Sequence, residues 1–325
     1  MPSMPELLRL PTGARPVLQG NTAFALGALH AGIHAADGYP GTPSTEAMEA
    51  ILEVPERLSA GWSVNEAVAV GVGVGHAIAG RDVVVTMKLP GLFQAADVVA
   101  SAAASSALSG ALILYIATDH APSSTQYLVD ARPFLASIRI PVLEPRDHQD
   151  LYRSCRSAAD LSREFGTPVA ILASSVLCHS EGMVTLEAAR TIAPAPSKAS
   201  AGHVLLPSDA LSSFREGVER KLPALAARAD SGILSEETEG STEFGIIATG
   251  EAALVVREAL SLLDIRPAVL TLGMTHPLPL RTIQAFSCKV DSLVLFEDGE
   301  RFVENSLRQA GIRLEGKELH PTVTN

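Results

Sequence analysis

Aromatic residues are scarce in this sequence. They make up 4% of its 325 residues, whereas hydrophobic residues of all kinds make up 47%. A hydrophobic core must therefore be assembled mainly from Ala, Val, Leu and Ile side chains. That composition fits helices packed on a parallel sheet better than a sandwich of two antiparallel sheets. The length is large for one domain and suits two.

Cysteine and basic residues are also in short supply. The cysteines Cys155, Cys178 and Cys288 lie far apart, and none belongs to a CxxC pair. This spacing excludes an iron–sulfur cluster ligated only by cysteines of this sequence, argues against a zinc finger and suits a reducing cytoplasm. Lys and Arg number 25 against 36 Asp and Glu, a formal net charge of −11. Without a basic cluster, this balance argues against a nucleic-acid-binding surface.

Sequence signals of secreted, membrane and nucleotide-binding proteins are missing as well. Residues 1–16 are broken by prolines and lack the apolar core of a signal peptide. Residues 98–118 carry no charge and are long enough to span a bilayer, but their serines and Gly110 predict a buried helix, a turn and a strand. No phosphate-binding glycine loop and no GxSxG motif occur. We therefore expect a cytoplasmic protein without a membrane span.

Apolar strand-like runs alternate with helix-like segments over the first 192 residues. This alternation predicts a doubly wound α/β domain with a mostly parallel sheet. In such sheets ligands bind at the carboxyl ends of the strands, where the loops 38–45, 87–92 and 118–126 should emerge. The expected strands are 32–36, 83–86, 112–116, 140–143 and 168–172, and the expected helices are 19–30 (capped by Asn21 or Thr22), 44–52, 66–79, 93–108 and 145–165.

Three predicted parts thus make up the chain: 1–192, 193–242 and 243–325. The first begins with residues 1–15, which we expect to form an extended arm. The second is a linker in which residues 206–240 form one exposed helix and a flexible tail. Strand and helix patterns resume in the third part and predict a smaller α/β domain, near the minimum size that folds alone.

Glu66 is the most conspicuous polar residue of the first domain. It stands at the head of a nearly uncharged helix that contains Gly71, Gly73 and Gly75. Each interior glycine weakens a helix by about 1 kcal/mol relative to alanine, so we expect another backbone to press closely against this helix. A carboxylate in such close packing is suited to proton transfer. The alternative is an exposed first-turn glutamate that complements the helix dipole.

Several sequence motifs surround Glu66. They are GYPGTPSTE (38–46), WSVNEAVAVGVGVGHAIAG (62–80), VTMK-x-x-GL (85–92), SS-x-Q (123–126) with Asp130-Ala131-Arg132, and VLEPRDHQD (142–150). Together they resemble the pyrimidine-binding part of thiamine diphosphate-dependent 2-oxoacid:ferredoxin oxidoreductases, most closely the alpha subunit of the indolepyruvate type. FGIIATG (244–250), LGMTHPLP (272–279) and VLFEDGERFVE (294–304) extend the resemblance into a transketolase C-terminal-like domain.

The resemblance implies a catalytic role for Glu66. In that family the matching glutamate shares a hydrogen bond with N1′ of the cofactor's aminopyrimidine. This contact favours the imino form of the ring, which removes a proton from the thiazolium. Tyr39, Pro40 and Gly41 would contact the same cofactor.

A substrate pocket is implied next to the cofactor. Thr42 and Lys88 would face the carboxylate of a 2-oxoacid, although as residue types they suit a helix cap and a solvated strand end equally well. Leu89 stands where indolepyruvate-type members commonly have a histidine, and His120 could supply an imidazole instead. The full set of pocket residues implied is Thr42, Lys88, His120, Ser123, Ser124 and Arg132.

Long members of this family carry further domains for the diphosphate and for iron–sulfur clusters, and the sequence up to Asn325 has neither. We therefore expect a partner subunit to hold the diphosphate and its Mg²⁺, with no metal ligand in this chain, in a heterotetramer of two such pairs. Iron–sulfur clusters and coenzyme A would belong to partner subunits. The implied reaction is oxidative decarboxylation of a 2-oxoacid to an acyl-CoA, with ferredoxin as acceptor. A subunit of a non-oxidative decarboxylase or carboligase, and a non-catalytic assembly or regulatory subunit, are the alternatives.

Two further features have less weight. Asp37-Gly38 and Asn65 have nearly the spacing of the magnesium-diphosphate signature of thiamine diphosphate enzymes, but Ala36 replaces its first glycine, and we expect a coincidence. The second domain is expected to be an assembly module that contacts other subunits through the loop 275–277. Within that loop we expect His276 to be structural rather than catalytic.

Overall fold

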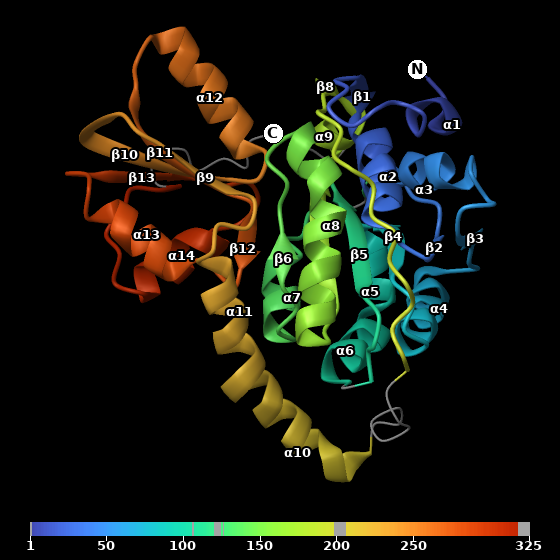
Figure 1. Cartoon of the computed structure of the whole chain (residues 1–325). Coiled ribbons are helices and arrows are strands. Elements are labelled where there is room, and N and C mark those ends of the chain that lie inside the picture. The colour runs from blue at the N-terminus through green and yellow to red at the C-terminus, as the bar shows by residue number, and fades with distance from the viewer. Residues whose placement is uncertain (1, 106, 120–124, 126, 198–205, 318–325) are drawn as a thin grey trace.

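The computed structural model describes residues 2–105, 107–119, 125, 127–197 and 206–317. Figure 1 shows two α/β bodies side by side, the larger one built from the first part of the chain. Within these described ranges, no helix combines the length and the hydropathy needed to cross a bilayer.

A seven-stranded sheet forms the centre of the larger body, in the order β12-β6-β7-β5-β4-β2-β3. Six of its strands are parallel, and β12 at one edge is antiparallel. The predicted α/β class with a mostly parallel sheet is thereby confirmed. The strands are β2 (Ala35–Gly38), β3 (Ser59–Trp62), β4 (Val83–Lys88), β5 (Leu112–Thr118), β6 (Val142–Leu143), β7 (Val169–Ser174) and β12 (Met274–His276).

Helices cover both faces of this sheet, as a parallel sheet requires. Alternate residues of the central strands point to opposite faces, so that Val84 and Ile113 pack into one core while Val83 and Leu112 pack into the other. The first core is covered by α2 (Gly20–Ala31), α3 (Thr45–Leu52) and α8 (His148–Phe165), and the second by α4 (Glu66–Ile78), α5 (Leu89–Gln94), α6 (Ala96–Ala104) and α7 (Arg132–Ser137).

The uncharged segment 98–118 forms the end of α6, a turn and the buried central strand β5, as expected. The helix expected at 93–108 is in fact divided between α5 and α6. The cap expected for α2 is also wrong. Asn21 lies inside this helix with its side chain buried, and its amide donates to the carbonyl oxygen of Pro43 at 2.8 Å.

The N-terminal region is more ordered than an extended arm. A short helix, α1 (Met4–Leu7), buries the side chains of Met4 and Leu7. Strand β1 (Val17–Gln19) then pairs antiparallel with β8 (Glu181–Met183), which follows the short helix α9 (Ser175–His179). This two-stranded ribbon ties the start of the chain to the end of the first domain.

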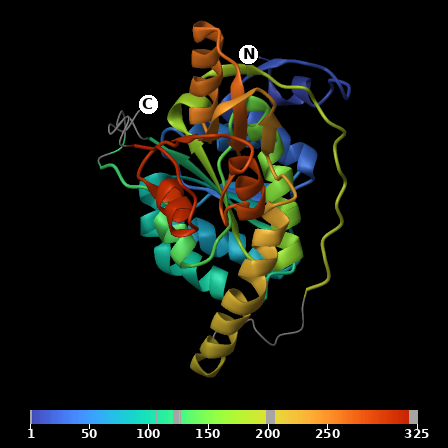
Figure 2. The same ribbon diagram turned by 90° about the vertical axis from the view of Figure 1, so that its left-hand side faces the viewer.

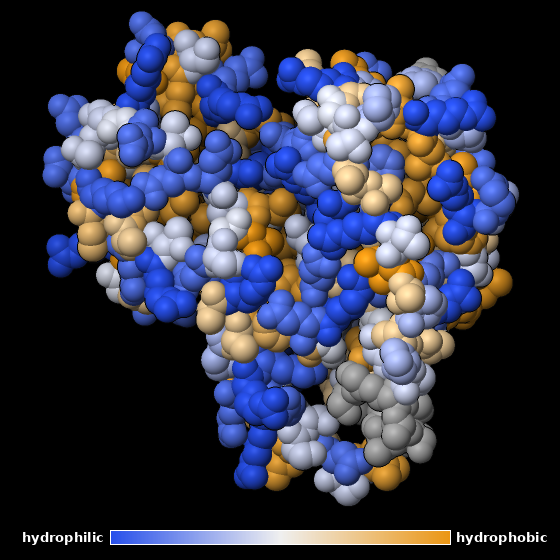
Figure 3. Space-filling model, in the orientation of Figure 1, coloured by the Kyte–Doolittle hydropathy of each residue, from blue (hydrophilic) through white to orange (hydrophobic). Residues whose placement is uncertain are grey.

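The smaller body contains a four-stranded sheet in the order β13-β10-β11-β9. The strands β10 (Ser241–Thr249), β11 (Pro267–Leu272) and β13 (Leu293–Phe296) are parallel, which agrees with the smaller α/β domain expected here. One face is covered by α13 (Leu280–Ser287) and α14 (Phe302–Gln309), and the other by α12 (Ala252–Leu263). In Figure 3 hydrophobic side chains are visible along α12.

The segment between the two bodies is a helical rod. It consists of α10 (Pro207–Arg215), the π-helical turn Glu216–Lys221 and α11 (Leu222–Ala229), and Figures 1 and 2 show it projecting away from both sheets. An exposed helix was expected here, but the flexible tail was not found. Instead, β9 (Ser235–Thr238) pairs antiparallel with β11 at the edge of the second sheet.

Candidate functional site

The carboxyl ends of neighbouring parallel strands bring the candidate residues to one edge of the large sheet. β2 lies between β3 and β4, with Gly38 opposite both Trp62 and Thr86, and Lys88 at the end of β4 lies opposite Ala117 of β5. The loop that follows β2 therefore leaves the sheet at the same edge as the end of β4, as predicted. Open α/β sheets bind their ligands in this position. The loop expected at 87–92 is instead the end of β4 and the start of α5, and most of the loop expected at 118–126 lies outside the described residues.

Glu66 is the first residue of α4, four positions after the end of β3. The first turn of α4 is held in place by two contacts. Oδ1 of Asn65 accepts a hydrogen bond from the backbone N–H of Val68 at 2.9 Å, and Oε1 of Gln94 accepts one from the N–H of Ala67 at 2.8 Å. The helix cap and Gln94 of α5 thus fix the backbone that carries the Glu66 side chain.

The Glu66 carboxylate packs directly on the backbone of α5. A Cβ atom placed on Gly91 would lie 2.4 Å from Oε1 of Glu66, so only glycine leaves room for this carboxylate. Glu66 is 8% exposed, and among the described residues its carboxylate has no hydrogen bond or ion pair. Burying a charged group without a partner is unfavourable, so the side chain is suited to receive a polar group from outside the chain.

The glycines within α4 differ in their surroundings. A Cβ on Gly73 would lie 2.6 Å from a methyl group of Val85 in the sheet, whereas a Cβ on Gly71 or Gly75 would meet no atom of the described residues within 4 Å. The expectation that another backbone presses on these glycines is therefore wrong within this chain. Gly71 and Gly75 lie on the outer side of the helix, with Val68 and Val72 at 44% and 39% exposure.

The loop after β2 lies against Lys88. A Cβ on Gly41 would come within 2.9 Å of Cγ of Lys88, so the aliphatic part of this lysine packs on the loop backbone. The loop is held by the N–H of Gly41, which donates to Oγ1 of Thr45 at 2.9 Å, and by the hydroxyl of Ser44, which donates to the Gly41 carbonyl at 2.8 Å. Tyr39, Pro40 and Thr42 of this loop are exposed.

Two consecutive buried hydrogen bonds hold this loop in place. The hydroxyl of Tyr115 on β5 donates to Oδ1 of Asn21 at 2.8 Å, and the amide of Asn21 donates to the Pro43 carbonyl. Burial raises the pKa of Tyr115 well above its ordinary value, so that the phenol stays a donor. Sequence inspection assigned Asn21 to a helix end, and no local signal indicated its contact with a loop 22 residues away.

Asp37 and Asn65 are engaged in local structure. Oδ1 of Asp37 accepts from the N–H of Gly38 at 2.7 Å. Burial raises the pKa of the Asp37 carboxyl, and hydrogen bonds from Ser63 and Gly38 offset part of this rise. The amide of Asn65 caps α4. These contacts fit the expected coincidence better than a diphosphate site. Among the residues that the structure describes, no group of three or more His, Cys, Asp or Glu side chains could hold a metal ion.

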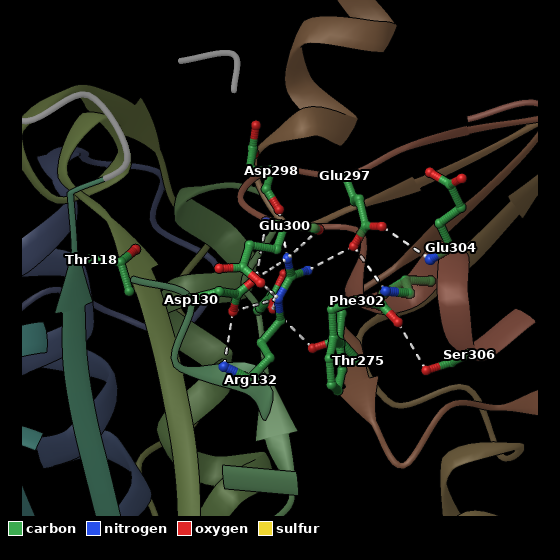
Figure 4. A network of polar contacts seen from close by, with 12 residues as sticks. Thr118, Asp130, Arg132, Thr275, Glu297, Asp298, Glu300, Phe302, Glu304 and Ser306 are labelled. Carbon is green, nitrogen blue, oxygen red and sulfur yellow. Dashed lines mark hydrogen bonds and ion pairs between the residues drawn. The ribbon is translucent and has the colours of Figure 1, made fainter. Parts of the chain in front are cut away.

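Arg132 has a different place from the predicted one. Figure 4 shows its guanidinium between the two bodies, bonded to Asp130 of the first and to Glu297 of the second. Its Nη2 atom also donates to the carbonyl oxygens of Asp298 and Glu300, at 2.6 and 3.2 Å. The side chain is 2% exposed, and its donors are used within the chain. Arg132 therefore joins the two domains, which corrects its assignment to the substrate pocket.

The loop 275–277 also lies between the two domains. Its strand β12 completes the large sheet by pairing with β6, and the buried Thr275 donates to Oε1 of Glu144 at 2.9 Å. The loop thus makes a contact inside the chain, and its expected contact with other subunits stays a prediction. Burial lowers the pKa of His276 to about 4, and its Nε2 has no hydrogen-bond partner within the described part of the chain.

The remaining predicted pocket residues can be placed only in part. His120, Ser123 and Ser124 lie outside the described residues. Asp119, at the entrance of their loop, accepts a hydrogen bond from the hydroxyl of Ser175 at 3.2 Å. Leu89 is buried at the start of α5 and belongs to the core under α4.

Comparison with known sequences gives relatives but no matching family model. The chain is 31% identical over 322 residues to indolepyruvate oxidoreductase subunit IorA of Archaeoglobus fulgidus, a match that covers 94% of this chain and 50% of that protein. The IorA protein of Methanothermobacter thermautotrophicus is 29% identical, with 93% and 50% covered. A 2-oxoglutarate synthase subunit KorA of A. fulgidus is 22% identical, with 86% and 87% covered. The chain thus spans about half the length of the IorA proteins.

Two solved structures resemble the fold. A 2-oxoglutarate:ferredoxin oxidoreductase from Magnetococcus marinus, solved with 2-oxoglutarate, coenzyme A and succinyl-CoA bound, matches with a TM-score of 0.75 at 18% identity, covering 93% of this chain and 61% of that one. A split-gene transketolase, described as an inactive tetramer, matches with a TM-score of 0.58 at 14% identity, covering 92% and 86%. At these identities the likeness concerns the fold alone.

Proposed function

Because this chain is similar over more than nine tenths of its length to IorA subunits of indolepyruvate oxidoreductases, we propose that it belongs to their family and supplies Glu66 as the catalytic carboxylate of a thiamine diphosphate-dependent active site. One observation carries the proposal. Glu66 is largely buried at the carboxyl edge of the sheet, rests on Gly91 and has no partner among the described residues.

The residues around Glu66 fit an aminopyrimidine ring. A carboxyl group is the side chain that can share a proton with a ring nitrogen, and this one is held by the cap at Asn65 and by the backbone at Gly91. When bound, thiamine diphosphate supplies the nucleophilic carbon and the electron sink. Glu66 holds and exchanges the proton at N1′, and its low exposure keeps water from competing for that hydrogen bond.

The loop after β2 and the end of β4 supply the rest of the site in this chain. Tyr39, Pro40 and Gly41 contact the cofactor, and Tyr39 and Pro40 are exposed and so accessible to it. Lys88, whose chain packs on Gly41, presents its ammonium group to the carboxylate of a 2-oxoacid, with Thr42 beside it. A cation and a hydroxyl donor are suited to a carboxylate, and their ordered placement reduces the entropy lost on binding.

A partner subunit holds the diphosphate and its Mg²⁺ in this proposal and covers the outer side of α4. Val68 and Val72 are exposed there beside Gly71 and Gly75, so another backbone can approach the helix closely. Iron–sulfur clusters and coenzyme A bind to partner subunits, and the 2-oxoacid is oxidised to an acyl-CoA with ferredoxin as acceptor. If the partner subunits lacked cysteines that could bind an iron–sulfur cluster, the complex would instead be a non-oxidative decarboxylase or carboligase.

Cofactor binding tests the division of the site between two chains. Calorimetric titration with thiamine diphosphate and Mg²⁺ should give weak binding to the isolated chain and tight binding to the complex with the subunit that copurifies with it. The reason is that the chain offers the aminopyrimidine contacts alone, and the charged diphosphate needs the partner. Tight binding to the isolated chain would contradict the proposal. It would indicate instead that Asp37 and Asn65 of this chain help to bind the diphosphate and its Mg²⁺.

Replacement of Gly91 by alanine should displace the Glu66 carboxylate. The new methyl group would lie 2.4 Å from Oε1 of Glu66, a distance at which one of them must move. We expect turnover of the complex to fall by at least about tenfold, because a misplaced catalytic group loses most of its effect. A Gly61→Ala variant is the matched control, since a Cβ on this glycine of β3 would meet no atom of the described residues within 4 Å. Equal turnover of Gly91→Ala and wild type would show that the carboxylate need not occupy this place.

A further inference from the structure

The second sheet is covered unequally on its two faces. Helices α13 and α14 pack on one face, whereas α12 alone packs on the other. Four strands span roughly 14 Å from the first axis to the last, and a helix is about 10 Å wide with its side chains. One helix therefore leaves part of this face open. Two hollows flank α12, with volumes of about 580 Å³ beside β11 and about 480 Å³ beside β13.

The hollow beside β13, here called the β13 groove, is strongly apolar. Its floor is formed by side chains of β10 and β13, and its wall by α12. Val255 and Leu263 on that wall are 60% and 66% exposed, and Figure 3 shows hydrophobic residues along the helix. A volume of about 480 Å³ lies within the usual range for small-molecule sites. The apolar residues that line the groove include Phe244, Ile246, Val255, Leu263, Val294 and Phe296.

Carboxyl groups stand at one end of the β13 groove. They belong to Glu251 and Asp298, which also line a small cavity against the first domain. Glu297 lines the groove as well, but its carboxylate is bound by Arg132 and by the N–H groups of Val303 and Glu304. Burial raises the pKa of Asp298 to about 7, and the nearby carboxylates of Glu251 and Glu144 act in the same direction. Within the described residues, the Asp298 carboxylate has no hydrogen bond or ion pair.

The cations near these carboxyl groups are already engaged. Lys317 and Arg132 act on Asp298 to lower its pKa, but burial and the neighbouring acids outweigh them. Nζ of Lys317 donates to the backbone carbonyl of Glu297 at 2.8 Å, and the guanidinium of Arg132 is bound to Asp130 and Glu297. Burial also raises the pKa of Glu251, against a hydrogen bond from Ser174. Among the described residues, the acidic end of the groove thus has no cation that is not already engaged.

We infer that the β13 groove binds a small amphipathic organic cation, with its apolar body on Phe244, Val255 and Phe296 and its ammonium group paired with Asp298 and Glu251. The apolar length of the groove selects against a bare metal ion, which has no group to fill it. The acidic end selects against an anion, and a neutral molecule would leave two acidic groups without a counterion. This site lies on a different domain from Glu66 and does not depend on the function proposed for that residue.

Three ring-matched probes separate these possibilities: 2-phenylethylamine, 2-phenylethanol and 3-phenylpropionate. Calorimetric titration of the full chain at pH 8 should show the amine binding at least about tenfold more tightly than the alcohol, and the acid most weakly. Asp298 must be ionised to pair with the amine. Affinity for the amine should therefore fall as the pH is lowered through about 7, whereas affinity for the alcohol should stay constant.

Variants of the chain locate the site. Asp298→Asn should bring the affinity for the amine close to that for the alcohol and remove its pH dependence. Val255→Ser should weaken both ligands, because it adds a hydroxyl to the apolar wall. Leu262→Ser is the matched control, since Leu262 is 80% exposed on the same helix and does not line the groove. The inference is overturned if the amine binds no better than the alcohol, if neither binds, or if Asp298→Asn leaves the preference for the amine unchanged.

Discussion

Replacing Glu66 by glutamine should lower turnover of the assembled complex by about 10²- to 10⁴-fold, the usual contribution of a positioned acid or base. Glutamine has nearly the same shape, so it can occupy the space beside Gly91 and preserve the packing of α4 on α5. An amide, however, cannot exchange a proton with N1′ of the cofactor. The defect should therefore appear in kcat, measured in steady state with saturating thiamine diphosphate and 2-oxoacid.

The control for Glu66→Gln is the same substitution at Glu49. This residue is an exposed glutamate on α3. Both variants should match the wild type in thermal unfolding and in assembly with the partner, measured by light scattering after chromatography. Turnover within about twofold of wild type for Glu66→Gln would remove the catalytic role from Glu66. Loss of assembly in that variant would instead place Glu66 in the subunit interface.

Most central strands could be predicted from sequence because they are short apolar runs between turn signals. The strand β4, with Val83, Val84 and Val85 all buried, is an example. By contrast, β2 (Ala35-Ala36-Asp37-Gly38) is less apolar and lies a few residues after the expected strand 32–36. The edge strand β3 escaped prediction since Ser59-Ala60-Gly61-Trp62 has little apolar character and little burial. The strand β12 escaped for another reason. Its partner β6 lies more than a hundred residues earlier, and local periodicity carries no information on such a pairing.

The position of Glu66 at the edge of the sheet could be anticipated because it follows a motif and heads a helix. The contact that confines its carboxylate could not, since Gly91 lies on a different helix and glycine has no side chain to suggest a role. Arg132 shows what a sequence resemblance cannot predict. A resemblance locates a residue along the chain but says nothing of where a flexible guanidinium points, and its acidic partner Glu297 belongs to the other domain.

Replacing Arg132 by methionine should destabilise the chain by about 3–5 kcal/mol, the usual cost of removing one partner from a buried ion pair. Arg132 pairs with three carboxylates: Asp130 and Glu297 are 2% exposed or less at their side chains, and Glu144, whose Oε1 lies 3.6 Å from Nε of Arg132, is 14% exposed. Methionine has a similar length and fills much of the same volume, so the loss would come chiefly from charge left without a partner. Denaturant unfolding at pH 7 measures the effect, and amide hydrogen exchange in β12 should quicken because the two domains separate more readily.

The pH dependence and a surface control distinguish lost charge pairing from lost packing. Burial tends to raise the pKa of Asp130, but its hydrogen bonds with Arg132 prevail and lower it, so this pair contributes stability that is lost only as the pH falls through the low folded-state pKa. Without Arg132, burial would raise the pKa of Asp130, and it would raise the pKa of Glu297 further, because burial already raises it in the intact chain despite Arg132. Protonation of these carboxyls would then remove the unpaired buried charge, and the difference in stability from wild type should shrink as the pH falls from 7 toward 5.

Arg281→Met is the matched control, because Arg281 is 74% exposed and pairs with Asp230 at 2.8 Å. Such surface pairs contribute about 1 kcal/mol or less. A loss of that size for Arg132→Met, independent of pH, would mean that the buried pair does not hold the two domains together.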